Sequence, residues 1–259
     1  AYQHVSEVVA CGDEIQSFEV GDIVYTGMFP GHVVYHLARE SDLIAKLPEG
    51  FDLIAGAMLG VASVAYHDAR RAQVGPGDKV LVMGAGLIGQ FAAQAARVMG
   101  ADHVTVAEPQ DDRRALADAL GAGLVLDPTT DSGDAVMAAQ APYSVVLECS
   151  GADVLNRIIG AVDQEGLIGV RSHARLVMVA GRYEVTYDFN MAGRAEVNIL
   201  HTQHFDQEDL DRVVALVANG DIRVRPLIRE VVPLTEAPRV YDTLRDRPGD
   251  LLGVVFTYS

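Results

Sequence analysis

The chain has 259 residues, and its 36 Asp and Glu outnumber its 20 Lys and Arg, which gives a formal net charge of −16. This balance excludes a protein that binds a nucleic-acid backbone, because such binding needs clustered positive charge. Hydrophobic residues make up 49% of the chain, which excludes a disordered polymer, and the length suits one large domain or two modest ones.

Cysteine content and apolar runs exclude further classes of protein. The two cysteines, Cys11 and Cys149, allow neither a disulfide framework nor a four-cysteine metal cluster. The longest apolar runs, such as Leu81–Gly89, are too short to span a membrane. Residues 1–10 lack the basic start of a signal peptide. We therefore expect a soluble cytoplasmic protein, and a first residue that is not Met favours a processed or truncated N-terminus.

The first fifty residues have the pattern of short β-strands. Apolar stretches at Val5–Ala10, Ile23–Tyr25 and His32–Leu37 alternate with turns that contain Gly12 and Gly21. From about residue 52 the chain becomes rich in alanine at helical spacing, which predicts a helix over residues 62–72.

After the breaker at residues 75–78, buried strands alternate with helices. The predicted strands are Lys79–Met83, His103–Ala107, Leu124–Leu126, Ser144–Glu148 and Leu176–Ala180. The predicted helices are Gly89–Met99, Arg113–Leu120 and Val154–Val162. This alternation is typical of an α/β fold with a doubly wound parallel sheet. Beyond it we expect a strand at Val197–His201 and a helix at Gln207–Asn219. An extended piece follows, then a helix at Tyr241–Arg245 and a last strand at Gly253–Thr257.

One motif carries a chemical prediction. Gly84-Ala85-Gly86-Leu87-Ile88-Gly89 follows a predicted strand directly and opens a predicted helix. In this order the first glycine permits a tight turn, the second lets a pyrophosphate approach the backbone, and the third lets the helix pack on the strand. The free N–H groups and the helix dipole favour a diphosphate there. We predict that Gly84, Gly86, Leu87, Ile88 and Gly89 bind a dinucleotide.

An acidic residue ends the second strand of this unit. Glu108 lies nineteen positions after Gly89, where a carboxylate accepts hydrogen bonds from the ribose hydroxyls of NAD and repels the 2′-phosphate of NADP. Arg113 follows five residues later and is a candidate contact to the adenosine ribose. Arg113 and Arg114 would also suit a 2′-phosphate if Glu108 moved aside. The pattern favours NAD over NADP.

Further motifs are Glu7–Gly12, Phe18–Val24, Gly31–Tyr35, Ala45–Gly50 and Val74–Val82. Together they resemble the medium-chain dehydrogenase/reductase superfamily, which contains the zinc alcohol dehydrogenases and their zinc-free relatives. The likeness runs over nearly the whole chain. The resemblance implies a Rossmann dinucleotide-binding domain and a partial GroES-like catalytic domain. It places the GroES-like part at residues 1–55, the Rossmann domain at 56–203 and the return to the catalytic domain at 204–259. It also implies a further segment ahead of Ala1.

The resemblance extends to single residues of the cofactor site but not to the metal ligands. Ser150 matches the loop beside the nicotinamide-side ribose, and Gly181 matches the loop that holds the carboxamide. Tyr2 stands where a zinc-ligating histidine is expected, and the later cysteine ligand falls at about Gly60. Since zinc prefers Cys, His and carboxylate ligands, we expect no metal.

Without zinc, a side chain must move the substrate's proton. His32 matches a position that lines the substrate pocket and titrates near neutrality, although a structural strand histidine is the alternative. Tyr2 is a second candidate, with a frayed terminal residue as the alternative. His67, beside Asp68, and Cys149, at a strand end, are interpreted as structural.

These observations predict an oxidoreductase that transfers a hydride between NAD(H) and a secondary alcohol or ketone, such as a polyol, a sugar or a pathway intermediate. Two alternatives remain open: an NADPH-dependent enoyl or quinone reductase, and a dinucleotide sensor without catalysis. The resemblance implies a homodimer or homotetramer that pairs through residues 197–201. We expect no nucleic-acid or membrane partner.

Overall fold

The computed structural model describes residues 3–27, 31–160, 169–247 and 249–258 and divides into two compact units. The central unit comprises residues 64–204, and the terminal unit comprises residues 1–63 together with residues 205–259. The domain boundaries expected from the sequence, near residues 55 and 203, stay a prediction.

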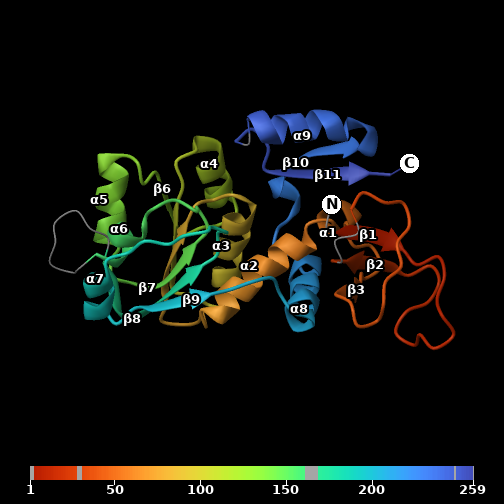
Figure 1. Ribbon diagram of the computed structural model, residues 1–259, viewed down its shortest axis with the longest axis horizontal. Helices are drawn as coiled ribbons and strands as arrows, with labels where there is room; N and C mark the ends of the chain where they lie inside the picture. Colours follow the sequence, from red (N-terminus) through yellow and green to blue (C-terminus); the bar gives the residue numbers. More distant parts are fainter. Residues whose placement is uncertain (1–2, 28–30, 161–168, 248, 259) are drawn as a thin grey trace. The chain divides into compact units, whose positions relative to one another are not determined.

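The central unit is built on a six-stranded parallel sheet (Figure 1), with the strand order β6-β5-β4-β7-β8-β9. Its strands are β4 (Lys79–Met83), β5 (His103–Ala107), β6 (Leu124–Leu126), β7 (Tyr143–Glu148), β8 (Val170–Met178) and β9 (Asn198–His201). The helices between them are α3 (Leu87–Val98), α4 (Asp111–Ala119), α5 (Asp131–Ala139), α6 (Leu155–Ile159) and α7 (Phe189–Arg194). The prediction of a doubly wound parallel sheet is confirmed.

Both faces of this sheet are covered because its strands carry apolar side chains in both directions. Leu81 and Met83 of β4 belong to a buried cluster that also holds Met137 of α5, Ile158 of α6 and Ala192 of α7. The alternate residues of the strand point to the other face, where α3 and α4 contact strands β4, β5 and β6. Figure 1 shows the two groups of helices on opposite sides of the sheet.

The terminal unit holds two small sheets. Strands β1 (His4–Glu7), β2 (Ile23–Thr26) and β3 (Ile44–Lys46) form an antiparallel sheet in that order. Strands β10 (Ile228–Pro233) and β11 (Gly253–Thr257) form a parallel pair. The helices are α1 (Leu53–Gly56), α8 (Gln207–Ala218) and α9 (Ala237–Asp246), with the 3-10 turns η1 (Arg225–Leu227) and η2 (Leu234–Glu236). Helix α2 (Leu59–Arg71) begins in this unit and continues into the central unit.

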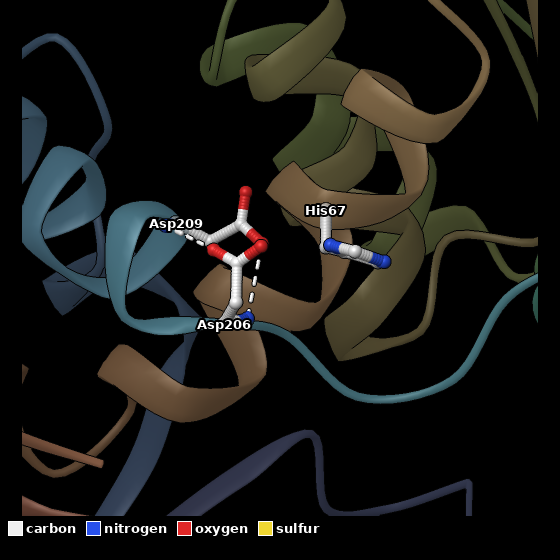
Figure 2. A group of neighbouring side chains, drawn as sticks. All are labelled: His67, Asp206 and Asp209. Atoms are coloured by element: carbon white, nitrogen blue, oxygen red, sulfur yellow. Dashed lines mark hydrogen bonds between the residues drawn. The ribbon is translucent and has the colours of Figure 1, made fainter. Parts of the chain in front are cut away.

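Side chains near the start of α8 explain why the helix begins at Gln207. The Asp206 carboxylate accepts a hydrogen bond from the Asp209 amide at 3.0 Å, and the Asp209 carboxylate accepts one from the Asp206 amide at 3.2 Å. Figure 2 shows these two carboxylates, together with His67 of α2. A reciprocal cap of this kind satisfies two amides that have no partner within the helix.

The structure corrects the prediction of a strand at residues 32–37. No strand is present there: Val34, Tyr35 and Leu37 are exposed, and the side chains of His32 and His36 bind hydroxyl groups instead. The third strand of the sheet is β3, which was not predicted as a strand and overlaps the motif Ala45–Gly50. Three residues are too few to show the alternation by which strands are predicted.

Several other limits differ from those predicted. Strand β8 begins six residues earlier than expected and ends two residues earlier, and helix α5 was not predicted at all. Part of the predicted helix at residues 154–162 lies outside the described residues, and α6 covers residues 155–159. Strand β9 lies at the edge of the described sheet, and pairing of two copies through it stays a prediction. No helix in the described ranges has both the length and the apolar character needed to cross a bilayer.

A histidine of β1 links the fold of the terminal unit to pH. His4 is 8% exposed, and its ring centroid lies 5.5 Å from that of His36. Burial lowers the pKa of His4 below its ordinary value, and the nearby His36 and His32 lower this pKa further, against a smaller opposing effect of the Gly31 backbone. The native state therefore binds a proton at His4 less readily than the unfolded chain does.

We predict that the free energy of unfolding falls as the pH drops below about 6.5, the ordinary pKa of histidine. The folded-state pKa is lowered, so the stabilisation is complete above the unfolded pKa and is lost as the pH falls toward the folded pKa. Urea unfolding followed by circular dichroism at pH 7 and pH 5 measures the loss. His4→Phe should make that loss smaller. The control His103→Phe, at an exposed position, should leave it unchanged, and an equal effect of both substitutions would contradict the assignment.

Candidate functional site

The loop between β4 and α3 contains three glycines, of which Gly84 and Gly89 are required by the packing of the backbone. Gly84 has a φ of +86°, and a Cβ atom on it would lie 2.9 Å from the Cα of Ser150. A Cβ on Gly89 would lie 1.9 Å from the carbonyl oxygen of Gly84. At Gly86 the surroundings are different, because an added Cβ would meet nothing within 4 Å. The loop is thus tightly packed on its inner side and open at Gly86.

Gly86 is also the N-cap of α3, and it offers no side chain to bind the first amides of the helix. Unpaired amides at a helix N-terminus bind anions, and the helix dipole adds to their attraction. The loop lies at the carboxyl end of β4, whose neighbours in the sheet are β5 and β7. The chain continues from β4 to β5 on one side and resumes at β7 on the other, so this is the point where the strand order reverses. Ligands of open α/β sheets bind at such a point.

Glu108 lies beside this loop at the end of β5. Its side chain is buried, with 4% exposure, and its two oxygens accept hydrogen bonds from the amides of Ala85 at 2.6 Å and Gln110 at 2.9 Å. A carboxylate offers about four acceptor positions, so two of them remain for donors from a ligand. Glu108 therefore fixes the glycine loop and keeps acceptor capacity beside it.

The two arginines after Glu108 differ in what they bind. Arg114 donates to the carbonyl oxygens of Glu108 at 2.7 Å and Pro109 at 2.6 Å, and it pairs with Asp111 and Asp127. The Arg113 side chain makes no hydrogen bond or ion pair with any residue that the structure describes. Arg114 thus holds the β5–α4 turn, whereas the Arg113 guanidinium is available to a ligand.

Gln90 is a residue of this region that the sequence analysis did not select. It is buried in α3, and its Nε2 donates to the carbonyl oxygens of Ala85 at 3.3 Å and Arg113 at 2.9 Å. It therefore connects the glycine loop to the start of α4. In the sequence, the signal for this structural role is a polar residue that directly follows the third glycine and precedes the apolar residues Phe91, Ala92 and Ala93.

On the other side of the glycine loop, Glu148 ends β7 and is fully buried. Its Oε1 accepts hydrogen bonds from the amides of Ser150 at 2.9 Å and Gly151 at 3.1 Å, and also from the Ser150 hydroxyl. Its Oε2 forms an ion pair with Arg182, which follows Gly181 after β8. The structure thus brings the predicted residues Ser150 and Gly181 to the same edge of the sheet as Gly84.

Neither Glu148 nor Arg182 was selected from the sequence. The available signal was a carboxylate that ends the apolar run of Val145, Val146 and Leu147, because a charge is rarely buried unless it is paired. Its partner Arg182 lies 34 positions later in a polar loop, and no local spacing relates the two residues.

The position where zinc-containing relatives are expected to bind their metal is closely packed. Gln3 Oε1 accepts a hydrogen bond from the amide of Gly60 at 2.9 Å, and the hydroxyl of the buried Tyr25 lies 3.4 Å from the same oxygen. A Cβ on Gly60 would lie 2.1 Å from the Tyr25 hydroxyl oxygen. In the described part of the chain, no group of His, Cys, Asp or Glu with ligand atoms in mutual reach includes a residue of β1. These residues do not fit zinc.

The two candidates for proton transfer have different outcomes. Tyr2 lies outside the described residues. His32 lies in the loop before β3, and its ring nitrogens bind the hydroxyls of Tyr241 at 2.8 Å and Tyr258 at 3.3 Å. Burial lowers the pKa of His32. These contacts connect the loop to the C-terminal segment, and the catalytic role of His32 stays a prediction.

The interpretation of Cys149 and His67 as structural stays a prediction. Burial raises the pKa of the Cys149 thiol, and the charge of Asp68 raises it further, so the reactive thiolate is disfavoured. His67 lies 3.4 Å from the guanidinium of Arg70, one turn further along α2.

Comparison with known proteins assigns the chain to a protein family. The sequence profile of the family described as zinc-binding dehydrogenase matches residues 88–219, just over half of the chain. The chain belongs to this family. The predicted membership of the medium-chain dehydrogenase/reductase superfamily is confirmed. The matched range includes Gly89 and Glu108, whereas Gln3, Tyr25 and Gly60 lie ahead of it.

Two curated relatives and one solved structure illustrate the similarity. The chain is 33% identical over 213 residues to a 2-dehydro-3-deoxy-L-galactonate 5-dehydrogenase of Pseudoalteromonas atlantica, covering 81% of this chain and 60% of that protein. It is 29% identical over 230 residues to D-xylulose reductase A of Aspergillus niger, covering 86% of this chain and 63% of that protein. The chain thus spans less than two thirds of the length of these relatives.

The solved structure confirms the fold. An Escherichia coli oxidoreductase/dehydrogenase of unknown specificity superposes with a TM-score of 0.88 at 21% identity, covering 99% of this chain and 81% of that one. Its likeness supports the predicted combination of a Rossmann domain and a GroES-like domain.

Two glycines of the loop should respond differently to alanine. Gly89→Ala places a methyl group against the Gly84 carbonyl, and we expect it to lower the free energy of unfolding by about 1–3 kcal/mol, the usual effect of overpacking. Gly86→Ala meets open space and should cost less than about 1 kcal/mol, as an N-cap change. Urea unfolding of the two variants measures the difference. Equal losses would mean that the loop packing is not as described.

Proposed function

We propose that this protein is an NAD(H)-dependent oxidoreductase that acts on a secondary alcohol of a polyol or sugar-derived substrate without a catalytic metal. The observation that carries the proposal is the glycine loop at the reversal of the strand order, with a buried carboxylate held against its amides. The activity of the whole protein is part of this proposal, because the chain spans only part of its relatives.

Support for a dinucleotide comes from the shape and charge of the loop. The open space at Gly86 and the uncapped start of α3 suit a diphosphate, which needs close approach and N–H donors. The free acceptor positions of Glu108 suit the ribose hydroxyls of NAD, and its charge repels a 2′-phosphate. Arg113 is available to the adenosine portion. A bound dinucleotide supplies the hydride acceptor or donor, while these residues bind and orient it.

Support for the substrate class comes from the relatives. One is named as a dehydrogenase of a deoxy sugar acid and the other as a reductase of xylulose, so both names describe oxidation or reduction at a hydroxyl-rich carbon chain. We propose a substrate of the same class. The residue that moves the hydroxyl proton stays open between His32 and Tyr2.

The absence of a catalytic metal is proposed from the contacts of Gln3. An amide oxygen that already accepts from the Gly60 amide and lies beside the Tyr25 hydroxyl is a weak ligand, and Gly60 has no space for a cysteine side chain. Zinc in proteins is held by Cys, His and carboxylate groups. No step of the proposed reaction therefore uses a metal.

Two alternative functions predict different measurements. An NADPH-dependent enoyl or quinone reductase would bind NADPH more tightly than NADH, against the expectation from Glu108. A sensor would bind NADH tightly and show no absorbance change at 340 nm with any polyol, sugar alcohol or sugar acid. Calorimetry with both cofactors, followed by a substrate panel, separates the three functions.

We predict that Glu108 determines the choice of cofactor. The wild-type protein should bind NADH more tightly than NADPH, and Glu108→Ala should reduce that preference by at least about tenfold, because the repulsion of the 2′-phosphate is lost. Calorimetric Kd values for both cofactors measure the ratio. Asp118→Ala, at an exposed position of α4, serves as the control and should leave the ratio unchanged. An unchanged ratio in Glu108→Ala would remove Glu108 from the cofactor site.

We predict that the purified protein contains well below one equivalent of zinc and loses no activity after EDTA treatment. Elemental analysis by mass spectrometry measures the first quantity, and turnover with the best substrate of the panel measures the second. The control is a zinc alcohol dehydrogenase treated in the same way, which should lose activity. One equivalent of zinc bound to this chain would refute metal independence and leave the dinucleotide proposal standing.

A further inference from the structure

The buried ion pair between Glu148 and Arg182 connects three segments of the central unit. Glu148 is the last residue of β7, in register with Met83 of β4 and Met178 of β8. It is fully buried among these apolar neighbours, whereas the Arg182 side chain is 15% exposed. A buried carboxylate in an apolar row requires a partner, and Arg182 supplies the opposite charge.

Besides the ion pair, Glu148 and Arg182 each make hydrogen bonds with the backbone of nearby loops. Glu148 accepts from the amides of Ser150 and Gly151, so its first oxygen fixes the β7–α6 loop. Arg182 donates to the carbonyl oxygens of Ala180 at 3.2 Å and Ala152 at 3.4 Å. The pair therefore joins the loop after β7 to the loop after β8.

The joined loops touch the glycine loop directly. A Cβ on Gly84 would lie 2.9 Å from the Ser150 Cα and 3.0 Å from the Ser150 amide nitrogen, which means that the two backbones are packed together. The strand order places β7 and β8 on one side of β4, and β5 with Glu108 on the other. A dinucleotide whose adenosine half lies toward Glu108 and whose diphosphate lies on the Gly86 amide must extend its other half over the β7 and β8 loops.

We propose that Arg182, acting through Glu148, is a positioning residue for the nicotinamide half of the dinucleotide and contributes little to binding of the adenine half. The inference rests on the proposed dinucleotide function and deepens it. The ion pair holds the loops of residues 150–152 and 180–181 in one arrangement. A ligand that contacts both loops thus avoids the entropic cost of ordering them.

The test compares two ligands that share the adenine half. NADH contacts both halves of the site, whereas ADP lacks the nicotinamide ring and the ribose that carries it. We expect Arg182→Gln to weaken NADH binding about tenfold, and to reduce the change in NADH fluorescence on binding, while ADP binds within about twofold of wild type. Arg182→Lys keeps the charge but cannot make all three contacts, and its loss for NADH should be intermediate.

An ion pair near the amino ends of the strands of the same sheet offers a control. Arg175 of β8 pairs with the buried Asp78, which precedes β4, and donates to the carbonyl oxygen of Gln73 at 2.9 Å. Arg175→Gln also removes an arginine partner from a buried carboxylate, while Arg171 stays 3.5 Å from Asp78, so it tests for a general effect of losing such a contact. We expect it to change the affinities for NADH and ADP by the same small factor.

A second variant covers the case in which Arg182→Gln does not fold. The double variant Glu148→Gln, Arg182→Gln leaves no buried charge without a partner, and the amide oxygen introduced by Glu148→Gln keeps an acceptor for the Ser150 and Gly151 amides. It should fold and still bind NADH about tenfold more weakly than wild type, with the affinity for ADP little changed.

Three results would overturn the inference. Unchanged NADH affinity in the Arg182 variants would show that the pair does not order the loops. Equal weakening of NADH and ADP binding, or the same selective loss in Arg175→Gln, would show a general structural effect. If wild-type protein binds neither ligand, the proposed dinucleotide function itself fails, and this outcome is distinct from the first two.

Discussion

The close approach of two backbone segments at Gly84 and Ser150 is the constraint on which the rest of the candidate site depends. It requires a glycine with φ of +86° on one side and places the loop after β7 against the loop after β4. Both segments follow neighbouring strands of a parallel sheet, so they lie at the same end of it. Carboxylates at strand ends bind amides of both segments: Ala85 donates to Glu108, and Ser150 donates to Glu148.

Those carboxylates, Glu108 and Glu148, flank the loop in similar positions but have different capacities. Glu108 accepts from two backbone amides and retains free acceptor positions, so it combines a structural role with the proposed contact to ribose. Glu148 accepts from three donors through one oxygen and meets an arginine with the other, so it is saturated by the protein. This difference is the reason to treat Glu108 as a ligand-binding residue and Glu148 as a positioning residue.

The sequence predicted the parts of the fold that depend on local pattern. Strands β4, β5, β6 and β11 have the predicted limits, because short apolar runs bounded by Gly, Pro or Asp carry a strong signal. The spacing of the glycines and Glu108 also predicted which residues meet at the end of β4. The strand at residues 32–37 was wrong, because alternation alone does not reveal whether a partner strand is present. There the side chains of His32 and His36 bind hydroxyls of Tyr241 and Thr26.

What the sequence did not provide is the pairing of distant residues. Glu148 pairs with Arg182, which lies 34 positions later in the chain. Gln90 bridges the backbone carbonyl oxygens of Ala85 and Arg113, and a sequence pattern does not reveal such backbone partners. The packing at the expected metal position was also not predictable from the sequence. The residue types there predicted that zinc ligands are missing, but only the structure shows that the Tyr25 hydroxyl lies where a side chain on residue 60 would begin. A substitution of Gly60 by cysteine would therefore not restore a ligand by itself, since Tyr25 must also be replaced before the thiol has space. Under the proposal of a metal-free site, a glycine at residue 60 and the packing of the Tyr25 hydroxyl against it therefore belong together.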